Sequence, residues 1–308
     1  MIEGQEGVTW DQWRALAAAA ERLGYEALFT SDHYGAGGIG SSDAWTVLAG
    51  LAARTERLRL GTLVSPVTFR HPTHLAKVAT TVDRISAGRA EIGMGAGWWE
   101  EEHKAHGFPF PHTGDRFEML AEQLEIVHGL LSDEQFSFEG RFYAVEDCTF
   151  APKGVQRPHP PIIVGSKGLQ RGIALAARWA DEFNTWRGTP TETGERFARV
   201  REAVDEAGRD QSRFATSLMT WCFVGETEHD WRDRIERAHR LDPDARPFDE
   251  FLAKAEHDCI VGTPDRAAER LSEYAGAGAQ RVMLNHSLFD DIEMLELLAE
   301  HVFPKVEG

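Results

Sequence analysis

Asp32 and His33 are adjacent and directly follow a short run, Tyr25–Thr30, that we predict to be a strand. A histidine titrates near neutral pH and can act as a general acid or base. We expect His33 to donate a proton or to contact a substrate, and Asp32 to orient His33 or to hydrogen bond to a bound ring. The alternative is a loop pair that only caps the following turn.

Three alternate glycines, Gly93, Gly95 and Gly97, precede Trp98 and Trp99. In a strand they would leave one face bare, because successive side chains point to opposite faces. A bare face accepts either a flat ligand or a closely packed neighbouring element, and both interpretations stay open on this segment alone. The segment is not a dinucleotide fingerprint, because Trp98 stands where the third glycine is needed.

A second glycine-containing loop, Gly165-Ser166-Lys167-Gly168, lies between the apolar run Ile162–Val164 and a predicted helix. Backbone amides and a helix amino terminus at this point can hold a phosphate, with Lys167 and Arg171 supplying positive charge. The spacing is not that of a P-loop, and an ordinary strand-to-helix turn is the alternative.

The elements that must position these residues repeat one rhythm, in which an Ala-rich helix and a glycine precede a short aliphatic strand. This alternation implies parallel βαβ units. We predict strands at Tyr25–Thr30, Leu58–Leu63, Glu91–Gly97, Pro161–Val164, Glu182–Thr185, Ala215–Val224 and Arg281–Leu284. We predict helices after Thr9, Ser42 and His71 and at Asp115–Leu131, Leu169–Trp179, Glu195–Ala207, Glu228–Arg240 and Ile292–His301, with one more after Thr263. With Met1–Glu3 as the remnant of a first strand, eight strands favour an α/β fold of the (β/α)8 TIM barrel type, whose active sites form at the strand carboxyl ends.

Two segments interrupt the rhythm. Phe136–Tyr143 alternates aromatic residues about a Glu-Gly turn and predicts a hairpin or extended excursion, whereas Leu241–Cys259 has the mixed composition of a lid. They predict insertions after helix four and before strand eight of a single domain over residues 1–308.

Composition limits the function classes. The 308 residues carry 33 basic and 50 acidic side chains, a net charge of −17, which disfavours nucleic acid or an anionic membrane surface as partner. Three scattered cysteines predict no disulfide framework, and the amino-terminal residues have no signal-peptide pattern. We therefore expect a cytoplasmic protein that acts on a small-molecule substrate.

Taken together, Ser31–His33, Gly61–Pro66 with Phe69–Pro72, Arg89–His103 and Pro160–Ser166 resemble the luciferase-like monooxygenase superfamily. The similarity is strongest to the branch that uses the deazaflavin coenzyme F420. The resemblance implies a TIM barrel with a deazaflavin or flavin ring in its mouth, and a homodimer paired through the helices at Ala44–Arg54 and Thr73–Ile85.

The resemblance also assigns roles by position. It implies a non-proline cis peptide at Leu63-Val64 beside the ring, a phosphate held after strand five, and His33 and Asp32 as catalytic residues. The implied cofactor-binding residues are Leu63, Val64, Ser65, Gly95, Gly97, Trp98, Gly165, Ser166, Lys167, Gly168 and Arg171, and no metal is implied. The implied function is an oxidoreductase that transfers hydride between F420 and a small organic substrate. The alternative is a monooxygenase that uses reduced FMN and oxygen.

The chain departs from the family pattern at Trp98 and Trp99, where several relatives carry a polar residue. We therefore expect no catalytic acid there and interpret Glu100–Glu102 as a solvated helix start. Two further classes are a non-catalytic flavin-binding barrel and a metal-dependent hydrolase. The latter would use histidines three residues apart, at positions 71 and 74 or 103 and 106.

Overall fold

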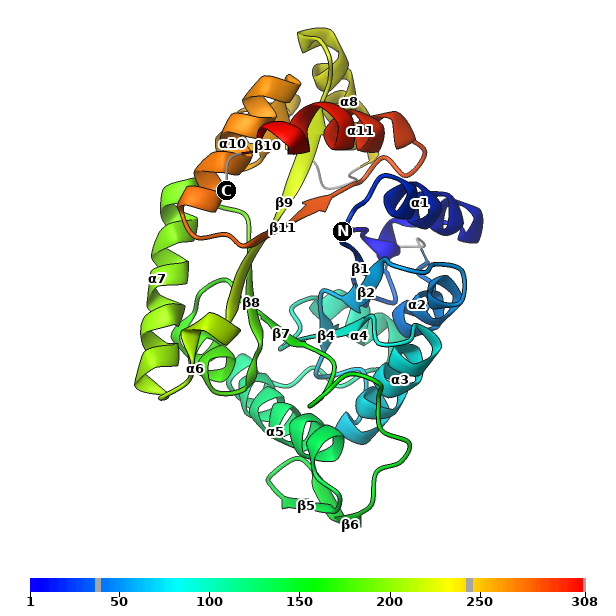
Figure 1. Ribbon diagram of the computed structural model, residues 1–308, viewed down its shortest axis with the longest axis vertical. Helices are drawn as coiled ribbons and strands as arrows, with labels where there is room; N and C mark the ends of the chain where they lie inside the picture. Colours follow the sequence, from blue (N-terminus) through cyan, green and yellow to red (C-terminus); the bar gives the residue numbers. More distant parts are fainter. Residues whose placement is uncertain (37–39, 242–245, 307–308) are drawn as a thin grey trace.

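A parallel sheet curls around the centre of the molecule and helices cover its outside (Figure 1). The computed structural model describes residues 1–36, 40–241 and 246–306. The strands are β1 (Ala27–Thr30), β2 (Arg59–Thr62), β3 (Ser65–Pro66), β4 (Ala90–Gly95), β7 (Ile162–Gly165), β8 (Glu182–Trp186), β9 (Ala215–Val224), β10 (Ile260–Gly262) and β11 (Arg281–Asn285). Their order is β1-β2-β4-β7-β8-β9-β10, with β11 also paired to β9 and β3 to β4, and all pairs are parallel.

The helices lie on the outer face, as parallel crossovers require. They are α1 (Trp10–Arg22), α2 (Ala44–Ala52), α3 (Pro72–Ile85), α4 (Glu100–His106), α5 (Thr113–Ser132), α6 (Gln170–Trp179), α7 (Pro190–Glu206), α8 (Glu228–Leu241), α9 (Phe248–Asp258), α10 (Pro264–Gly276) and α11 (Ile292–Leu297). Short 3-10 turns occur at Gly4–Glu6, Gln211–Arg213 and Phe303–Lys305, and a π turn at Leu298–Val302. Among the described residues, no helix is long and apolar enough to cross a bilayer.

Local sequence explains several helix starts. Thr9 and Gln12 form the capping box of α1, and Pro72 occupies the first turn of α3. Thr189 caps α7 in the same way, so this helix begins at Pro190, five residues before the predicted start at Glu195. Prediction missed this start because the Thr-Pro signal was not used.

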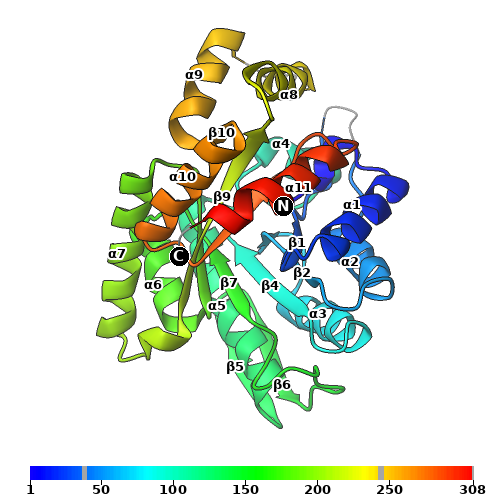
Figure 2. The same cartoon turned by 45° about the horizontal axis from the view of Figure 1, so that its top comes forward.

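The two predicted interruptions take defined forms at opposite ends of the molecule (Figures 1 and 2). β5 (Phe136–Glu139) and β6 (Ala144–Cys148) pair in an antiparallel hairpin, one of the two forms that the aromatic alternation predicted. Within the proposed lid, Phe248–Asp258 forms α9, and residues 242–245 lie outside the described residues.

The space inside the curled sheet is layered. Phe29, Leu63, Ile163 and Met283 form an apolar layer. Nearer the amino ends of the strands, Arg281 bonds to Glu91 at 2.8 Å and to Glu182 at 3.0 Å. These layers close the interior and leave the strand carboxyl ends as the place for ligands.

Met1 and Ile2 lie between β1 and β11. Ile2 forms a parallel bridge with Thr30, while the Met1 amino group donates to the Leu284 carbonyl at 2.9 Å. The predicted remnant of a first strand is thus a two-residue contact between the two strands.

Candidate functional site

His33 lies just beyond the carboxyl end of β1 and is bonded to a carboxylate from a distant element. Its Nδ1 atom is 2.8 Å from Oε2 of Glu102, in the first turn of α4. The other oxygen of Glu102 accepts the backbone N–H groups of Tyr34 and Gly35, at 2.5 and 2.9 Å. Glu102 is therefore fully satisfied and holds both the imidazole and the loop that carries it.

The two groups favour each other's charged forms. Burial opposes the charge on each, but the hydrogen bond and the attraction between them prevail, so the pKa of His33 is raised and that of Glu102 is lowered. A cationic imidazole bonded at Nδ1 to a carboxylate leaves Nε2 as its proton donor. The expectation that Glu102 is a solvated helix start is wrong, because its side chain is buried.

Asp32 has a different role from the predicted orienter of His33. Its carboxylate accepts from Ser65 Oγ at 2.6 Å and from the Arg70 guanidinium at 2.5 Å. Burial raises the pKa of Asp32 despite the neighbouring Arg70 cation. The structure gives the orienting role to Glu102, and Asp32 instead fixes the loop after β2 against the loop after β1.

The peptide bond between Leu63 and Val64 is cis, as the resemblance implies. The half-buried Val64 side chain lies across the carboxyl ends of β4 and β7. A Cβ atom at Gly95 would come within 2.5 Å of Val64 Cγ2, and one at Gly165 within 2.8 Å of Val64 Cγ1. These glycines therefore make room for Val64.

This packing decides between the two interpretations of the alternate glycines. A Cβ atom at Gly93 would lie 1.9 Å from the Thr62 carbonyl oxygen, and one at Gly97 would contact Pro66 at 3.3 Å. Close packing of the β2–β3 segment explains the pattern. The prediction that the bare face of Gly95 receives a flat ligand is wrong, because Val64 covers it.

Two tryptophans stand beside His33. The Trp98 and Trp99 rings stack on each other, and both meet the imidazole edge to face, with centroids 5.8 and 5.6 Å away. Trp98 is 69% exposed, so it forms an outer wall of the site and is not buried against the rim.

The loop after β7 gathers positive charge. Gly168 has a φ of +81° and precedes α6, whose first turn carries Arg171. Lys167 is exposed, with its amine 5.0 Å from the Trp186 ring centre. A Cβ atom at Gly168 would lie 3.1 Å from Arg196 Cγ and 3.3 Å from an Arg199 Nη atom, so α7 brings two further arginines to this loop.

Sequence reasoning missed these two arginines. Arg196 and Arg199 are three residues apart on the helix that follows β8, so they share one face, and that spacing was an available signal.

The opposite side of the mouth holds Trp186 and Arg187, at the end of β8. The Arg187 guanidinium is 2.7 Å from an Asp258 oxygen and 4.2 Å from the Trp221 ring centre. Its positive charge is therefore neutralised within the protein.

The histidine pairs of the hydrolase alternative have other partners. His103 bonds to Thr68 and to the Trp99 carbonyl, and His71 caps α3. Over the described ranges, no three His, Cys, Asp or Glu side chains are grouped as a metal site requires.

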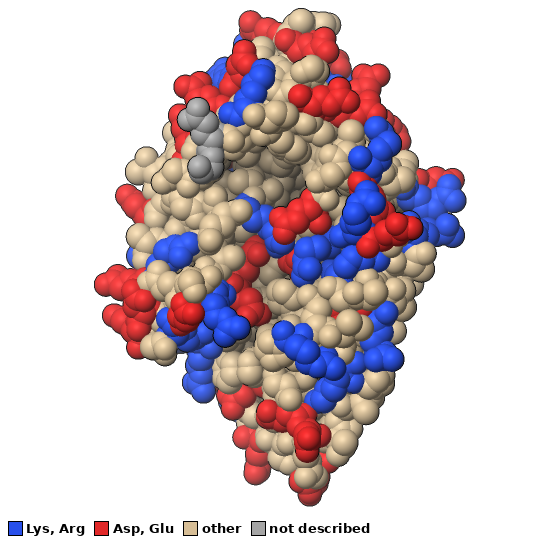
Figure 3. Space-filling view, in the orientation of Figure 1, with Lys and Arg blue, Asp and Glu red and all other residues tan. Residues whose placement is uncertain are grey.

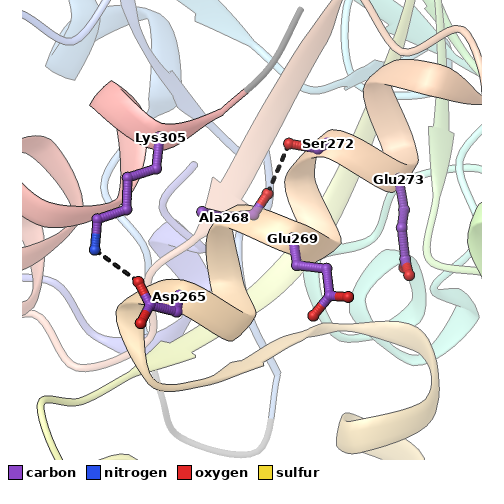
Figure 4. Close-up of a pocket in the computed structure, with 6 residues that line it drawn as sticks. All are labelled: Asp265, Ala268, Glu269, Ser272, Glu273 and Lys305. Carbon is purple, nitrogen blue, oxygen red and sulfur yellow. Dashed lines mark hydrogen bonds and ion pairs between the residues drawn. The ribbon is translucent and has the colours of Figure 1, made fainter.

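Figure 4 shows a separate hollow of about 560 Å³ on the outside of α10. Three carboxylates line it, and its lysine, Lys305, is bonded to Asp265 at 2.7 Å. Because this hollow lies on the outer helix layer, it does not belong to the site at the strand ends.

Comparison with known proteins agrees with this geometry. Residues 2–281 match the family described as luciferase-like monooxygenase. The chain is 28% identical to the F420-dependent glucose-6-phosphate dehydrogenase of Microbacterium testaceum, over 93% of this chain and 90% of the relative.

Solved structures give similar matches. Monooxygenase RslO1 from Streptomyces bottropensis is 26% identical with a TM-score of 0.83, covering 98% of each chain. An F420-dependent secondary alcohol dehydrogenase, solved with an F420-acetone adduct, is 19% identical with a TM-score of 0.82, covering 100% of this chain and 99% of that one. At 19% identity the second match shows the fold alone.

Proposed function

Because the chain belongs to the luciferase-like monooxygenase family, we propose that it is an F420-dependent oxidoreductase that exchanges hydride with a small organic substrate. The observation that carries this proposal is the His33–Glu102 pair at the strand ends. Reduction of a carbonyl needs a proton at oxygen as well as a hydride at carbon, and a cationic imidazole held by a buried carboxylate provides that proton. The F420-dependent relative supports the choice of cofactor.

The residues at the mouth fit such a cofactor. The amides of Gly165, Ser166 and Gly168 and the cations of Lys167 and Arg171 would hold its phosphate. We add Arg196 and Arg199 to this set, because both approach Gly168. Leu63, Val64 and Ser65 would support the ring, with the Val64 side chain as the contacting surface. Gly95 and Gly97 would act by making room for that segment, and Trp98 would wall the site.

When bound, the deazaflavin supplies or accepts the hydride. His33 donates a proton to the substrate oxygen as a carbonyl is reduced and removes it as an alcohol is oxidised. Glu102 stabilises the cationic imidazole and fixes its orientation. Trp98 and Trp99 reduce the access of water to His33. Asp32 acts by positioning, through Ser65 and Arg70.

We further propose that the substrate is uncharged and partly apolar, such as a secondary alcohol or its ketone. Trp98 and Trp99 flank His33, while Trp186 is 39% exposed on the other side of the mouth. Arg187 is already paired with Asp258 and is not free to bind a substrate phosphate. This differs from the sugar phosphate named for the relative from Microbacterium testaceum.

The second candidate is an FMN-dependent monooxygenase that uses reduced flavin and oxygen. The similarity to monooxygenase RslO1 favours it, at an identity close to that of the F420-dependent relative. The same phosphate loop would serve FMN.

Three further expectations belong to the proposal. We propose a closed (β/α)8 barrel in which Met1 and Ile2 belong to the first strand, forming one domain over residues 1–308 with insertions at the β5–β6 hairpin and before β11. We also propose a cytoplasmic homodimer paired through α2 and α3. Light scattering of the purified protein at micromolar concentration tests the dimer, and a monomeric mass would contradict it.

Equilibrium binding tests the cofactor. We expect F420 to bind more tightly than FMN, and Lys167→Ala or Arg199→Ala to weaken F420 binding about tenfold each, the loss of one charge-assisted contact. Lys305→Ala is the matched control, because Lys305 lies on the outer surface. Tighter binding of FMN would favour the second candidate, and unchanged affinity in Lys167→Ala and Arg199→Ala would remove the phosphate site.

A further inference from the structure

A cavity of about 740 Å³ lies between β1 and β11, outside the proposed active site. Both strands line it, together with residues of α1, α10, α11 and the carboxyl-terminal turn. Figure 3 shows a hollow in the upper half of the molecule, walled by residues that are neither acidic nor basic, where Figure 1 draws β11, α11 and the amino terminus. A large apolar cavity inside a layered α/β protein needs an explanation, because protein interiors are normally close-packed.

The cavity coincides with an open seam in the sheet. Within the described residues, β1 pairs only with β2 and β11 only with β9, apart from the contacts of Met1 and Ile2. Two strand edges therefore face each other with their backbone groups directed into the cavity. Buried backbone groups without partners are unfavourable, so the seam has the properties of a strand-binding slot.

Met1 marks the upper end of the slot and fixes its register. Ile2 donates to the Phe29 carbonyl at 2.9 Å, which places Met1 level with Phe29. On the other edge, Met1 donates to Leu284, and its carbonyl accepts from His286 at 3.0 Å. Met1 thus already pairs with both edges as a residue of a parallel strand would.

The Met1 amino group is poorly suited to this position. It is buried, and burial lowers its pKa to about 5. An amide N–H at the same place would make the bond to Leu284 without the desolvation of a charged terminus.

We infer that the seam is filled by one extended segment of about four residues joined directly to the amino group of Met1, running parallel to β1 and β11. β11 begins at Arg281, so the slot extends from the level of Leu284 down to that of Arg281, which is about four residues at a strand's rise. The occupant is covalently continuous because Met1 enters the slot in register and only its amino side faces the cavity.

The walls predict which residues this segment carries. The residues first and third before Met1 lie level with Leu284 and Val282, whose side chains pack in the outer core, so both should be large and apolar. The second lies level with Ala27 and Met283 in the inner apolar layer.

The fourth residue before Met1 lies level with Arg281, which contacts Glu26, Glu91 and Glu182. With Arg59 on Glu91, three carboxylates face two guanidiniums, so a basic side chain at the fourth position completes the charge balance.

The test compares the printed chain with a version preceded by Met-Arg-Val-Ala-Val. This extension places valine at the first and third positions, alanine at the second and arginine at the fourth. The matched control is Met-Val-Arg-Val-Ala, which has the same composition slipped by one residue, so that arginine enters the apolar layer. Neither extension touches the mouth, so the result is independent of the proposed cofactor and substrate.

We expect the in-register extension to raise the midpoint of thermal unfolding by about 5 °C or more, and the slipped control to raise it little or lower it. The in-register extension should also reduce the fluorescence of an added naphthalene-sulfonate dye that binds exposed apolar cavities, and the control should not. Equal midpoints for the two extensions would overturn the inference. So would a printed chain whose oligomers dissociate on extension, because a second copy would then be the occupant.

Discussion

At the scale of residues, one carboxylate sets the chemistry of the site. Glu102 accepts hydrogen bonds from His33 and from two backbone amides, and it is the partner that raises the pKa of His33 against the effect of burial. Sequence reasoning placed His33 correctly at a strand end but chose Asp32 as its partner, because Asp32 is adjacent in sequence. The bond to Glu102 spans 69 positions, and within an acidic run nothing local separates the buried carboxylate from its exposed neighbours.

Replacing Glu102 should change the pH dependence of turnover. In Glu102→Gln the pKa of His33 falls, because burial then acts with less opposition, so activity that needs the protonated imidazole is lost at lower pH than in the parent. The measurement is the pH profile of the carbonyl-reducing rate. Glu101→Gln, an exposed neighbour on the same helix, is the control and should keep the parent profile. Superimposable profiles for Glu102→Gln and the parent would contradict the assignment.

His33→Ala should reduce turnover by a factor of about 10² to 10⁴, the usual contribution of a general acid, while leaving the affinity for the cofactor nearly unchanged. Steady-state rates and binding titrations on the same preparation separate the two effects. A proportional loss of binding would instead make His33 a cofactor contact.

The pair also makes stability depend on pH in a definite direction. The folded-state pKa of His33 is raised, so its contribution is complete below the ordinary value of 6.5 and is lost as the pH rises through the folded-state value. The pKa of Glu102 is lowered, so its contribution is present above 4.5 and is lost as the pH falls through the folded-state value. Unfolding midpoints measured across this range should depend less on pH in His33→Ala than in the parent. An unchanged slope would show that the pair does not couple to folding.

At the scale of elements, the alternate glycines of β4 and the cis bond after β2 form one packing unit. Val64 fills the space that Gly95 and Gly165 leave free. Gly95→Ala should therefore destabilise the protein by about 1 to 3 kcal/mol, the usual range for overpacking. In the double variant Gly95→Ala, Val64→Ala, part of that loss should be recovered. Urea unfolding of the four proteins in the cycle gives the coupling, and strictly additive effects would show that the two side chains do not compete for space.

Element prediction succeeded where the signal was local. The βα rhythm placed most strands and helices, and Thr9 with Gln12 marked the start of α1. It could not tell whether the glycines faced a ligand or a neighbour, because the neighbour is Val64, some 30 residues away and turned inward after a cis bond. Arg199 was missed for a related reason, since its closeness to Gly168 depends on how α7 packs beside α6.

At the scale of the whole molecule, the seam between β1 and β11 is the least predictable feature. The bond from Met1 to Leu284 joins residues 283 positions apart, and no local pattern sets such a pairing. The parallel architecture was predictable from the alternation of elements. The concentration of Lys167, Arg171, Arg196 and Arg199 at one loop of a chain with a net charge of −17 explains how an acidic protein can still bind an anionic cofactor.

The most direct test of the central claim is an anaerobic absorbance assay with F420 and a series of secondary alcohols, run beside oxygen uptake with reduced FMN. We predict that an uncharged alcohol bleaches the oxidised deazaflavin in the parent protein, that His33→Ala slows this bleaching, and that reduced FMN gives no oxygen uptake above the free flavin. Oxygen uptake stimulated by the protein with reduced FMN, together with no bleaching of F420 by any alcohol, would contradict the proposed function.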